Sequence, residues 1–217
     1  INHVTLIGSG INLLLTTGKI LAGIIGKSSA MVADGVHSLS DFVTDIIVLV
    51  FIRFSGKERD QDHQYGHGKF ETFATMLISF ALLIVGAGII WAGVNKIIGS
   101  MHGIAIEQPG YIALAAAIVS ILSKEGLFWY TKIMGTKVNS QAMIANAWHH
   151  RSDAFSSIGT TLGISGAIIL GEKWRVLDPI AGIIVSFFIL KVAWQIAKPS
   201  INELLERSLP EETLKEI

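Results

Sequence analysis

Six apolar stretches, each about long enough to cross a lipid bilayer, constrain the fold of this chain more than any other feature. Short polar segments separate them, and they cover residues 4–25, 30–52, 70–98, 111–133, 141–170 and 178–197. Only 16% of all residues are charged, whereas soluble domains carry about 25%. We therefore expect an all-α integral membrane protein with six transmembrane helices, the last of which ends at Pro199 because proline cannot continue the helical hydrogen bonds.

The polar tail after the sixth stretch suggests a second domain. Residues 1–199 are expected to form the six-helix transmembrane domain, and the charged residues 200–217 to begin a C-terminal cytoplasmic domain that is largely missing from this chain. Six spans place both ends on one side of the membrane, where the polar segments contain more lysine and arginine than those opposite. Positive residues favour the cytoplasmic side, so we expect cytoplasmic termini.

Charge and cysteine usage exclude some kinds of site. Lysine plus arginine and aspartate plus glutamate number 17 each, so the net charge gives no indication of a nucleic-acid partner. Cysteine is absent, which excludes disulfides and thiolate ligands. A sulfur-rich metal site is therefore excluded.

Ionisable side chains recur at helical spacing inside two of the apolar stretches. The set consists of Asp34, His37, Asp41 and Asp45 in the second stretch, and of His149 and Asp153 in the fifth. Residues three or four apart share one face of a helix. Each ionisable group costs about 2.5–3.5 kcal/mol at the centre of a bilayer, so such stripes need a partner, and a cation is the simplest one.

Spacing separates candidate ligands from their neighbours. His37, Asp41, His149 and Asp153 form the most compact set, and two imidazoles with two carboxylates suit a divalent metal such as zinc. The remaining candidates for supporting or proton-linked roles are Asp34, Asp45 and His150, the last of which points off the line of the fifth stretch. The alternative is that all these groups are ion pairs or hydrogen-bonded groups that only hold helices together.

Lysines also occur within the apolar stretches. Lys124 and Glu125 are adjacent and cannot face each other on one helix, so each is expected to pair with another helix. Lys19 and Lys191 lie far enough along their stretches to extend to the membrane surface, and no role is assigned to them.

The polar loop after the second stretch contains a further cluster. Asp60, His63 and His67, with Asp62 nearby, could hold a second metal ion, or could belong to a solvated loop at the bilayer surface. Spacing alone favours neither interpretation.

Three ordered motifs together resemble the cation diffusion facilitator family. They are His37-x-x-x-Asp41, residues 65–69 (Tyr-Gly-His-Gly-Lys) and residues 148–153 (Trp-His-His-Arg-Ser-Asp). The six-span layout and residues 205–210 (Leu-Glu-Arg-Ser-Leu-Pro) agree, and the resemblance runs from about Gly26 to the end.

The resemblance implies a homodimeric antiporter in the bacterial inner membrane that exports divalent cations in exchange for protons. It implies that the two His-Asp pairs form the transport site, that Asp60, His63 and His67 form a loop site, and that Lys69 pairs with Glu206 to couple the membrane and soluble parts. Many members carry aspartate where this chain has His37; the imidazole favours zinc, with cadmium, iron, cobalt and manganese as further candidates.

The expected mechanism is alternating access, in which protons and metal compete for the same ligands, because metal binding requires neutral histidine. This makes the chain a transporter and not an enzyme. A passive channel is the main alternative, but a compact four-ligand cage holds ions too tightly for fast flow. An intramembrane metallohydrolase is a weaker alternative, since the chain has no His-Glu-x-x-His motif.

Overall fold

The computed structural model describes residues 2–54, 68–138 and 141–205, and the described residues confirm the all-α prediction. A 3-10 turn, η1 (Glu172–Trp174), precedes the last helix. The long helices are α1 (Asn2–Ile25), α2 (Ser29–Phe54), α3 (Gly68–Met101), α4 (Tyr111–Lys137), α5 (Gln141–Ile169) and α6 (Leu177–Leu204).

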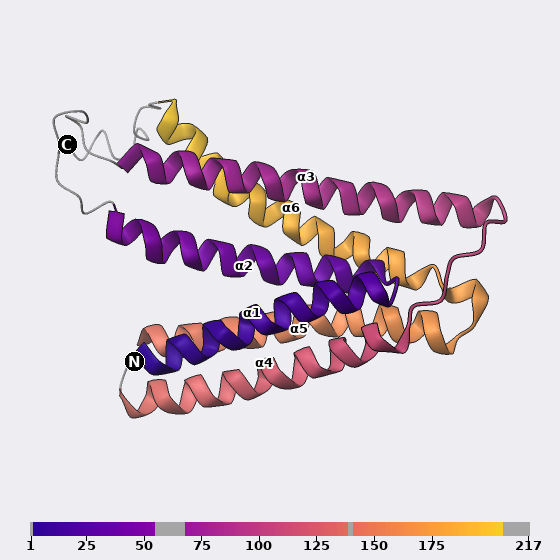
Figure 1. The fold of residues 1–217 in the computed structure, drawn as a ribbon, viewed down its shortest axis with the longest axis horizontal. Helices are drawn as coiled ribbons and strands as arrows, with labels where there is room; N and C mark the ends of the chain where they lie inside the picture. Colours follow the sequence, from indigo (N-terminus) through magenta and orange to yellow (C-terminus); the bar gives the residue numbers. More distant parts are fainter. Residues whose placement is uncertain (1, 55–67, 139–140, 206–217) are drawn as a thin grey trace, which may run out of the picture.

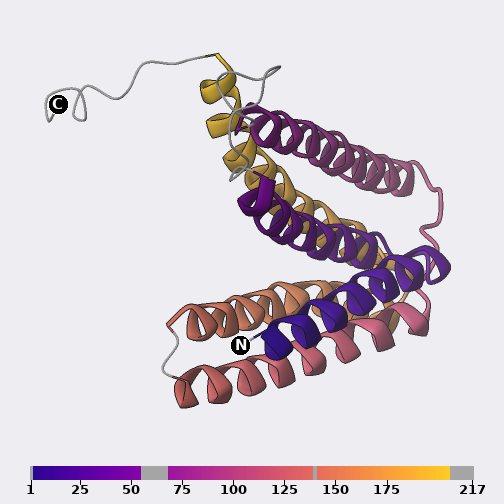
Figure 2. The same ribbon diagram turned by 60° about the vertical axis from the view of Figure 1, so that its left-hand side comes forward.

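The helices pack in two groups that both contact α2, and α5 of one group also contacts α6 of the other (Figure 1). One group contains α1, α4 and α5, and the other contains α3 and α6. Both views show α2 and α5 close together toward the end where α1 connects to α2, and apart toward the opposite end (Figures 1 and 2). The first residues of α1 and the last residues of α6 lie at that opposite end (Figure 1).

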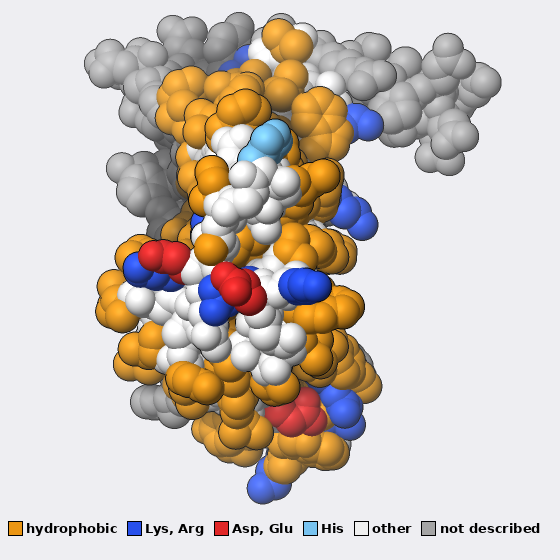
Figure 3. Space-filling view, turned by 90° about the vertical axis from the view of Figure 1, so that its right-hand side faces the viewer, with side chains coloured by type: hydrophobic (Ala, Val, Ile, Leu, Met, Phe, Trp, Pro, Cys, Tyr) orange, Lys and Arg blue, Asp and Glu red, His pale blue; other side chains and the backbone are white. Residues whose placement is uncertain are grey.

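The helices are apolar on their outer surfaces, as expected of a membrane protein. Among the described residues, α1, α3, α4 and α6 are long and apolar enough to cross a membrane. Large side chains such as Trp91 and Leu122 are 71% and 67% exposed. Figure 3 looks at the end of the molecule where α1 joins α2. Charged side chains gather across the middle of this face, and hydrophobic ones cover much of the surface around them.

The other two long helices, α2 and α5, are the ones that carry the predicted ligands. With 26 and 29 residues they are about 39 and 44 Å long, enough to cross the hydrocarbon core. Among the described residues, only four of the six long helices meet both the length and the composition expected of a membrane span. The number of membrane crossings therefore stays a prediction.

Small side chains form much of the contact between helices. A cluster of buried residues from α2, α4, α5 and α6 has four alanines among its six members: Ala30, Met31, Ala113, Ala117, Ile164 and Ala181. At Gly182 of α6, an added Cβ would lie 3.0 Å from the backbone of Ser29. Small residues permit such close approach where lipid leaves packing as the main attraction between helices.

Asp178 of α6 caps the first turn of α2. Its carboxylate accepts hydrogen bonds from the Ser29 backbone N–H at 2.7 Å and from the Ser28 hydroxyl at 2.5 Å. The Ser28 hydroxyl in turn accepts one from the backbone N–H of Met31 at 3.1 Å. A carboxylate suits a helix N-terminus because the unpaired N–H groups carry partial positive charge. The cap fixes the position of α2 along its own axis relative to α6. His37 lies about 12 Å further along α2, so its position relative to α6 is fixed as well.

The prediction that the sixth helix ends at Pro199 is wrong, because α6 continues through this proline to Leu204. Proline removes one backbone hydrogen bond. This loss is tolerated more easily near the end of a helix, where Pro199 lies, than in its middle. The Ser200 hydroxyl also donates to the Ile196 carbonyl oxygen at 3.1 Å. The carbonyl of Ile196 is next along the chain to that of Gln195, which loses its helical partner because proline has no N–H.

Candidate metal centre

His37 and Asp41 of α2 meet Asp153 of α5 inside the helix bundle. One ligand atom from each of the three lies within 4.8 Å of the other two. Asp153 is buried, with 8% of its surface exposed, and the two α2 residues are half-buried. Their positions one turn apart on α2 place both side chains on the face that approaches α5. Three of the four predicted ligands therefore lie together.

The fourth predicted ligand, His149, lies beside this group and not within it. Its Nε2 atom is 3.9 Å from Oδ2 of Asp153, one turn further along α5. Its side chain is 50% exposed, so the ring reaches the boundary of the site.

Two buried atoms of the group lack hydrogen-bond partners in the described part of the chain. They are Nδ1 of His37 and Oδ2 of Asp41. Buried polar atoms are nearly always paired, so each such atom needs an explanation. A divalent cation between the helices would use both atoms. In a tetrahedral zinc site the ligand atoms are about 3.3 Å apart, so an incoming ion would draw this group closer together.

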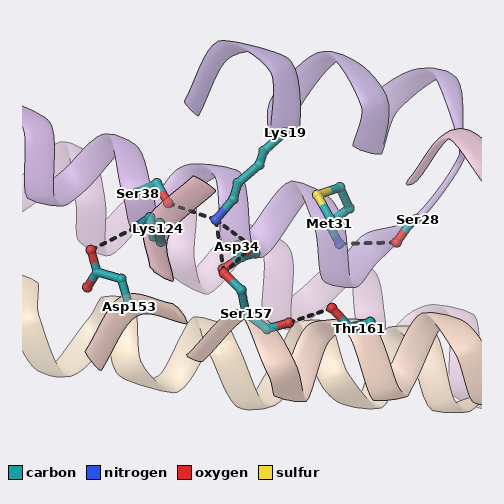
Figure 4. A network of polar contacts seen from close by, with 9 residues as sticks. All are labelled: Lys19, Ser28, Met31, Asp34, Ser38, Lys124, Asp153, Ser157 and Thr161. Atoms are coloured by element: carbon teal, nitrogen blue, oxygen red, sulfur yellow. Dashed lines mark hydrogen bonds and ion pairs between the residues drawn. The ribbon is translucent and has the colours of Figure 1, made fainter. Parts of the chain in front are cut away.

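Lys124 of α4 forms an ion pair with one member of the group. Its Nζ atom donates to Oδ2 of Asp153 at 2.7 Å, and the two side chains are 4% and 9% exposed (Figure 4). The neighbouring Glu125 lies 3.7 Å from Nε of Arg151 on α5. Both contacts confirm the prediction that these two residues pair with another helix.

A second buried ion pair lies one turn away along α2. The Lys19 ammonium of α1 is 2.7 Å from Oδ2 of Asp34 and also donates to the hydroxyls of Ser38 and Ser157 at 3.1 Å each (Figure 4). The Ser157 hydroxyl of α5 donates to the Asp34 carboxylate at 3.1 Å. The network joins three helices.

The expectation that Lys19 extends to the membrane surface is therefore wrong, because this side chain is only 1% exposed. An aspartate on α2 lies at the same depth and holds the ammonium inside the bundle. Lys191, for which the same was expected, is exposed.

A cavity of about 540 Å³ lies beside the ligands, between α5 and α6. His37 and Asp153 line it together with polar residues that include Ser156, Lys191 and Gln195. The cavity provides room for water next to two of the grouped ligands.

The remaining predicted residues are separate from the group or outside the described residues. His150 is buried on α5, and its Nε2 atom is 3.9 Å from where a Cβ would lie at Gly8 of α1. Lys69 is exposed at the start of α3. The predicted residues outside the described residues are Asp60, His63, His67 and Glu206, together with the side chain of Asp45.

Comparison with known proteins finds relatives named for metal tolerance, metal efflux or metal transport. Over 215 residues the chain is 40% identical to metal tolerance protein C1 of Arabidopsis thaliana, covering 94% of this chain and 45% of the relative. It is 38% identical over 217 residues to the manganese efflux system protein MneP of Bacillus subtilis, covering 98% and 71%. It is 32% identical over 228 residues to mitochondrial metal transporter 2 of Saccharomyces cerevisiae, covering 96% and 47%.

The chain spans about half the length of several of these curated relatives. Its residues 5–205 match the family model described as the cation efflux transmembrane domain, which confirms the resemblance to cation diffusion facilitators. Because that match covers nearly the whole chain, the protein belongs to the cation efflux family, a family of membrane transporters and not of enzymes.

Proposed function

We propose that this chain forms the membrane part of a divalent-cation exporter. His37, Asp41, His149 and Asp153 bind the ion between α2 and α5. The observation that carries the proposal is the grouping of three ligand atoms from two helices within 4.8 Å. Two of these residues have buried atoms without a hydrogen-bond partner among the described residues.

Exchange of the ion for protons follows from the chemistry of the ligands. Histidine titrates near neutral pH and must be neutral to bind a metal, so protons and metal compete for the same residues. Both helix groups contact α2, and a relative movement of the groups would expose the site first to one side of the membrane and then to the other. Asp34, Asp45 and His150 are candidates for supporting this proton exchange.

Zinc is the substrate that the proposed ligands favour. Imidazole nitrogen suits zinc, whereas sites made only of oxygen suit harder ions such as manganese. The relatives include manganese efflux proteins. We therefore place zinc first, with cadmium, iron, cobalt and manganese as competitors.

The proposal extends to the assembly and its setting. The protein is a homodimer in a bacterial inner membrane, with six crossings within residues 1–199, cytoplasmic termini, and a soluble domain that follows the end of α6 at Leu204. A loop site and an interdomain ion pair complete the set of functional residues: Asp60, His63 and His67 for the loop site, and Lys69 with Glu206 for the pair.

Proton-driven zinc uptake into liposomes tests the proposed site. The purified full-length protein is reconstituted, a pH gradient is imposed, and initial rates are measured. Loss of a residue that only supports a ligand costs roughly 10- to 100-fold, so Asp41→Ala and Asp153→Ala, which each remove a direct ligand, should lower the rate by at least that much. Glu107→Gln, which neutralises an exposed carboxylate far from the site, is the control and should transport normally. Wild-type rates in both alanine variants would remove the site assignment.

The same assay separates an antiporter from a channel. Antiport should saturate at low zinc concentrations and stop when the pH gradient is removed. Flux that rises linearly with zinc and ignores the gradient would favour a channel.

A further inference from the structure

The Asp153 carboxylate has more neighbours than a simple metal ligand needs. It belongs to the group of atoms within 4.8 Å, it lies 3.9 Å from His149, and its Oδ2 atom forms the 2.7 Å ion pair with Lys124. Figure 4 shows the Lys124 ammonium directed at this carboxylate. An incoming cation would therefore meet a carboxylate that is already paired with the Lys124 ammonium.

We propose that Lys124 is a tethered cation that occupies Asp153 in the metal-free site and sets how tightly the divalent ion is held. The inference rests on the proposed function of the site. In the metal-free site Lys124 offsets the negative charge of Asp153, with which it forms the buried ion pair. A divalent ion entering the site must displace the ammonium from Asp153 or bind beside it, and repulsion between the two cations is strong at this depth because screening is weak.

A weakened site has a direct use in transport. The apparent affinity for the ion equals the intrinsic affinity multiplied by the fraction of molecules whose Asp153 carboxylate is free of the ammonium. When the ion leaves, Lys124 returns to Asp153, so release does not leave an unpaired carboxylate in the membrane. Lys124 thus makes both binding and release possible at one site.

A purely structural role for Lys124 explains the geometry less well. The helices it joins, α4 and α5, are held together by other contacts near the same level, including that of Glu125 with Arg151. The rings of Phe128 and Trp148 also meet, with centroids 5.3 Å apart. Tying α4 to α5 therefore does not require an ammonium on a residue of the metal group.

The Lys19–Asp34 pair provides an internal contrast. It is as short and as buried as the Lys124 pair, but Asp34 is not a member of the metal group. Its carboxylate is bound by Lys19 and Ser157. Neutralising Lys19 should disturb packing, whereas neutralising Lys124 should change metal affinity.

Zinc binding measured by calorimetry on the purified full-length protein tests this distinction. Lys124→Gln should bind zinc on the order of 10- to 100-fold more tightly than wild type, because the competing charge is gone. In liposomes it should lower both KM and kcat, since release becomes slow. Lys124→Arg keeps the positive charge, and a guanidinium can donate two hydrogen bonds to one carboxylate. This variant should therefore bind zinc no more tightly than wild type. Lys19→Gln should not tighten binding.

Each outcome has a distinct meaning. Failure of wild type to bind zinc or any of the competing divalent metals, or unchanged zinc binding by Asp153→Ala, would overturn the proposed site itself. Loss of binding in Asp153→Ala together with unchanged affinity in Lys124→Gln would overturn only the role of Lys124, as would equal tightening by Lys19→Gln. If Lys124→Gln does not fold, Lys124→Arg decides: tighter binding than wild type contradicts the proposal, and equal or weaker binding supports it.

Discussion

Lys19→Met removes the positive half of the buried pair with Asp34 and tests whether this network holds the helices together. The pair is 2.7 Å long and both side chains are 1% exposed. Methionine retains most of the apolar stem, so the loss falls mainly on charge and hydrogen bonds. Breaking a buried pair on one side costs about 3–5 kcal/mol. For a chain of this size, that corresponds to a fall in Tm of about 6 to 20 °C.

Thermal unfolding in detergent, followed by tryptophan fluorescence, measures the effect. Lys27→Met is the matched control, because Lys27 pairs with Glu107 at 2.8 Å while both side chains are more than half exposed. Exposed pairs contribute little, so this control should leave Tm nearly unchanged. Lys19→Met combined with Asp34→Asn should recover most of the loss, since no buried charge is left unpaired. A fall no larger than that of Lys27→Met, or no recovery in the double variant, would refute the reasoning.

Two further predictions concern the cap and the ligands. Asp178→Ala removes the acceptor at the start of α2 and should lower the free energy of unfolding by about 0.5–2 kcal/mol. Asp178→Asn keeps an acceptor, so its loss of stability should be smaller. Equal losses of the two variants in thermal unfolding would contradict the capping role. His37→Asp replaces a nitrogen ligand by oxygen and should move the preference from zinc toward manganese in competition binding. An unchanged ranking of the two metals would mean that residue 37 does not set selectivity.

The helices could be predicted from the sequence because bilayer thickness sets their length. The apolar stretch at 111–133 already begins where α4 begins, at Tyr111, and the stretch at 141–170 differs from α5 by one residue at its end. The helical period also predicted that His37 and Asp41 share a face. These features depend on local spacing and composition, which a sequence shows directly.

Contacts between helices were harder to predict. The sequence shows that Lys19 lies within an apolar stretch but not that Asp34 of the next helix lies at the same depth, and this alone decides whether the lysine is buried or reaches water. The partner of Lys124 was likewise open until α4 and α5 were placed side by side. Pro199 was assigned as a helix end from its missing N–H, although one lost bond near a terminus is a small cost to a long helix.

The position of a bound metal tests the central claim most directly. Crystals of the full-length protein soaked in zinc, with data collected on both sides of the zinc absorption edge, would locate the ion by anomalous scattering. The account predicts a peak between α2 and α5, about 2.0–2.2 Å from ligand atoms of His37, Asp41 and Asp153. Zinc peaks elsewhere in the molecule, with none between these residues, would contradict it.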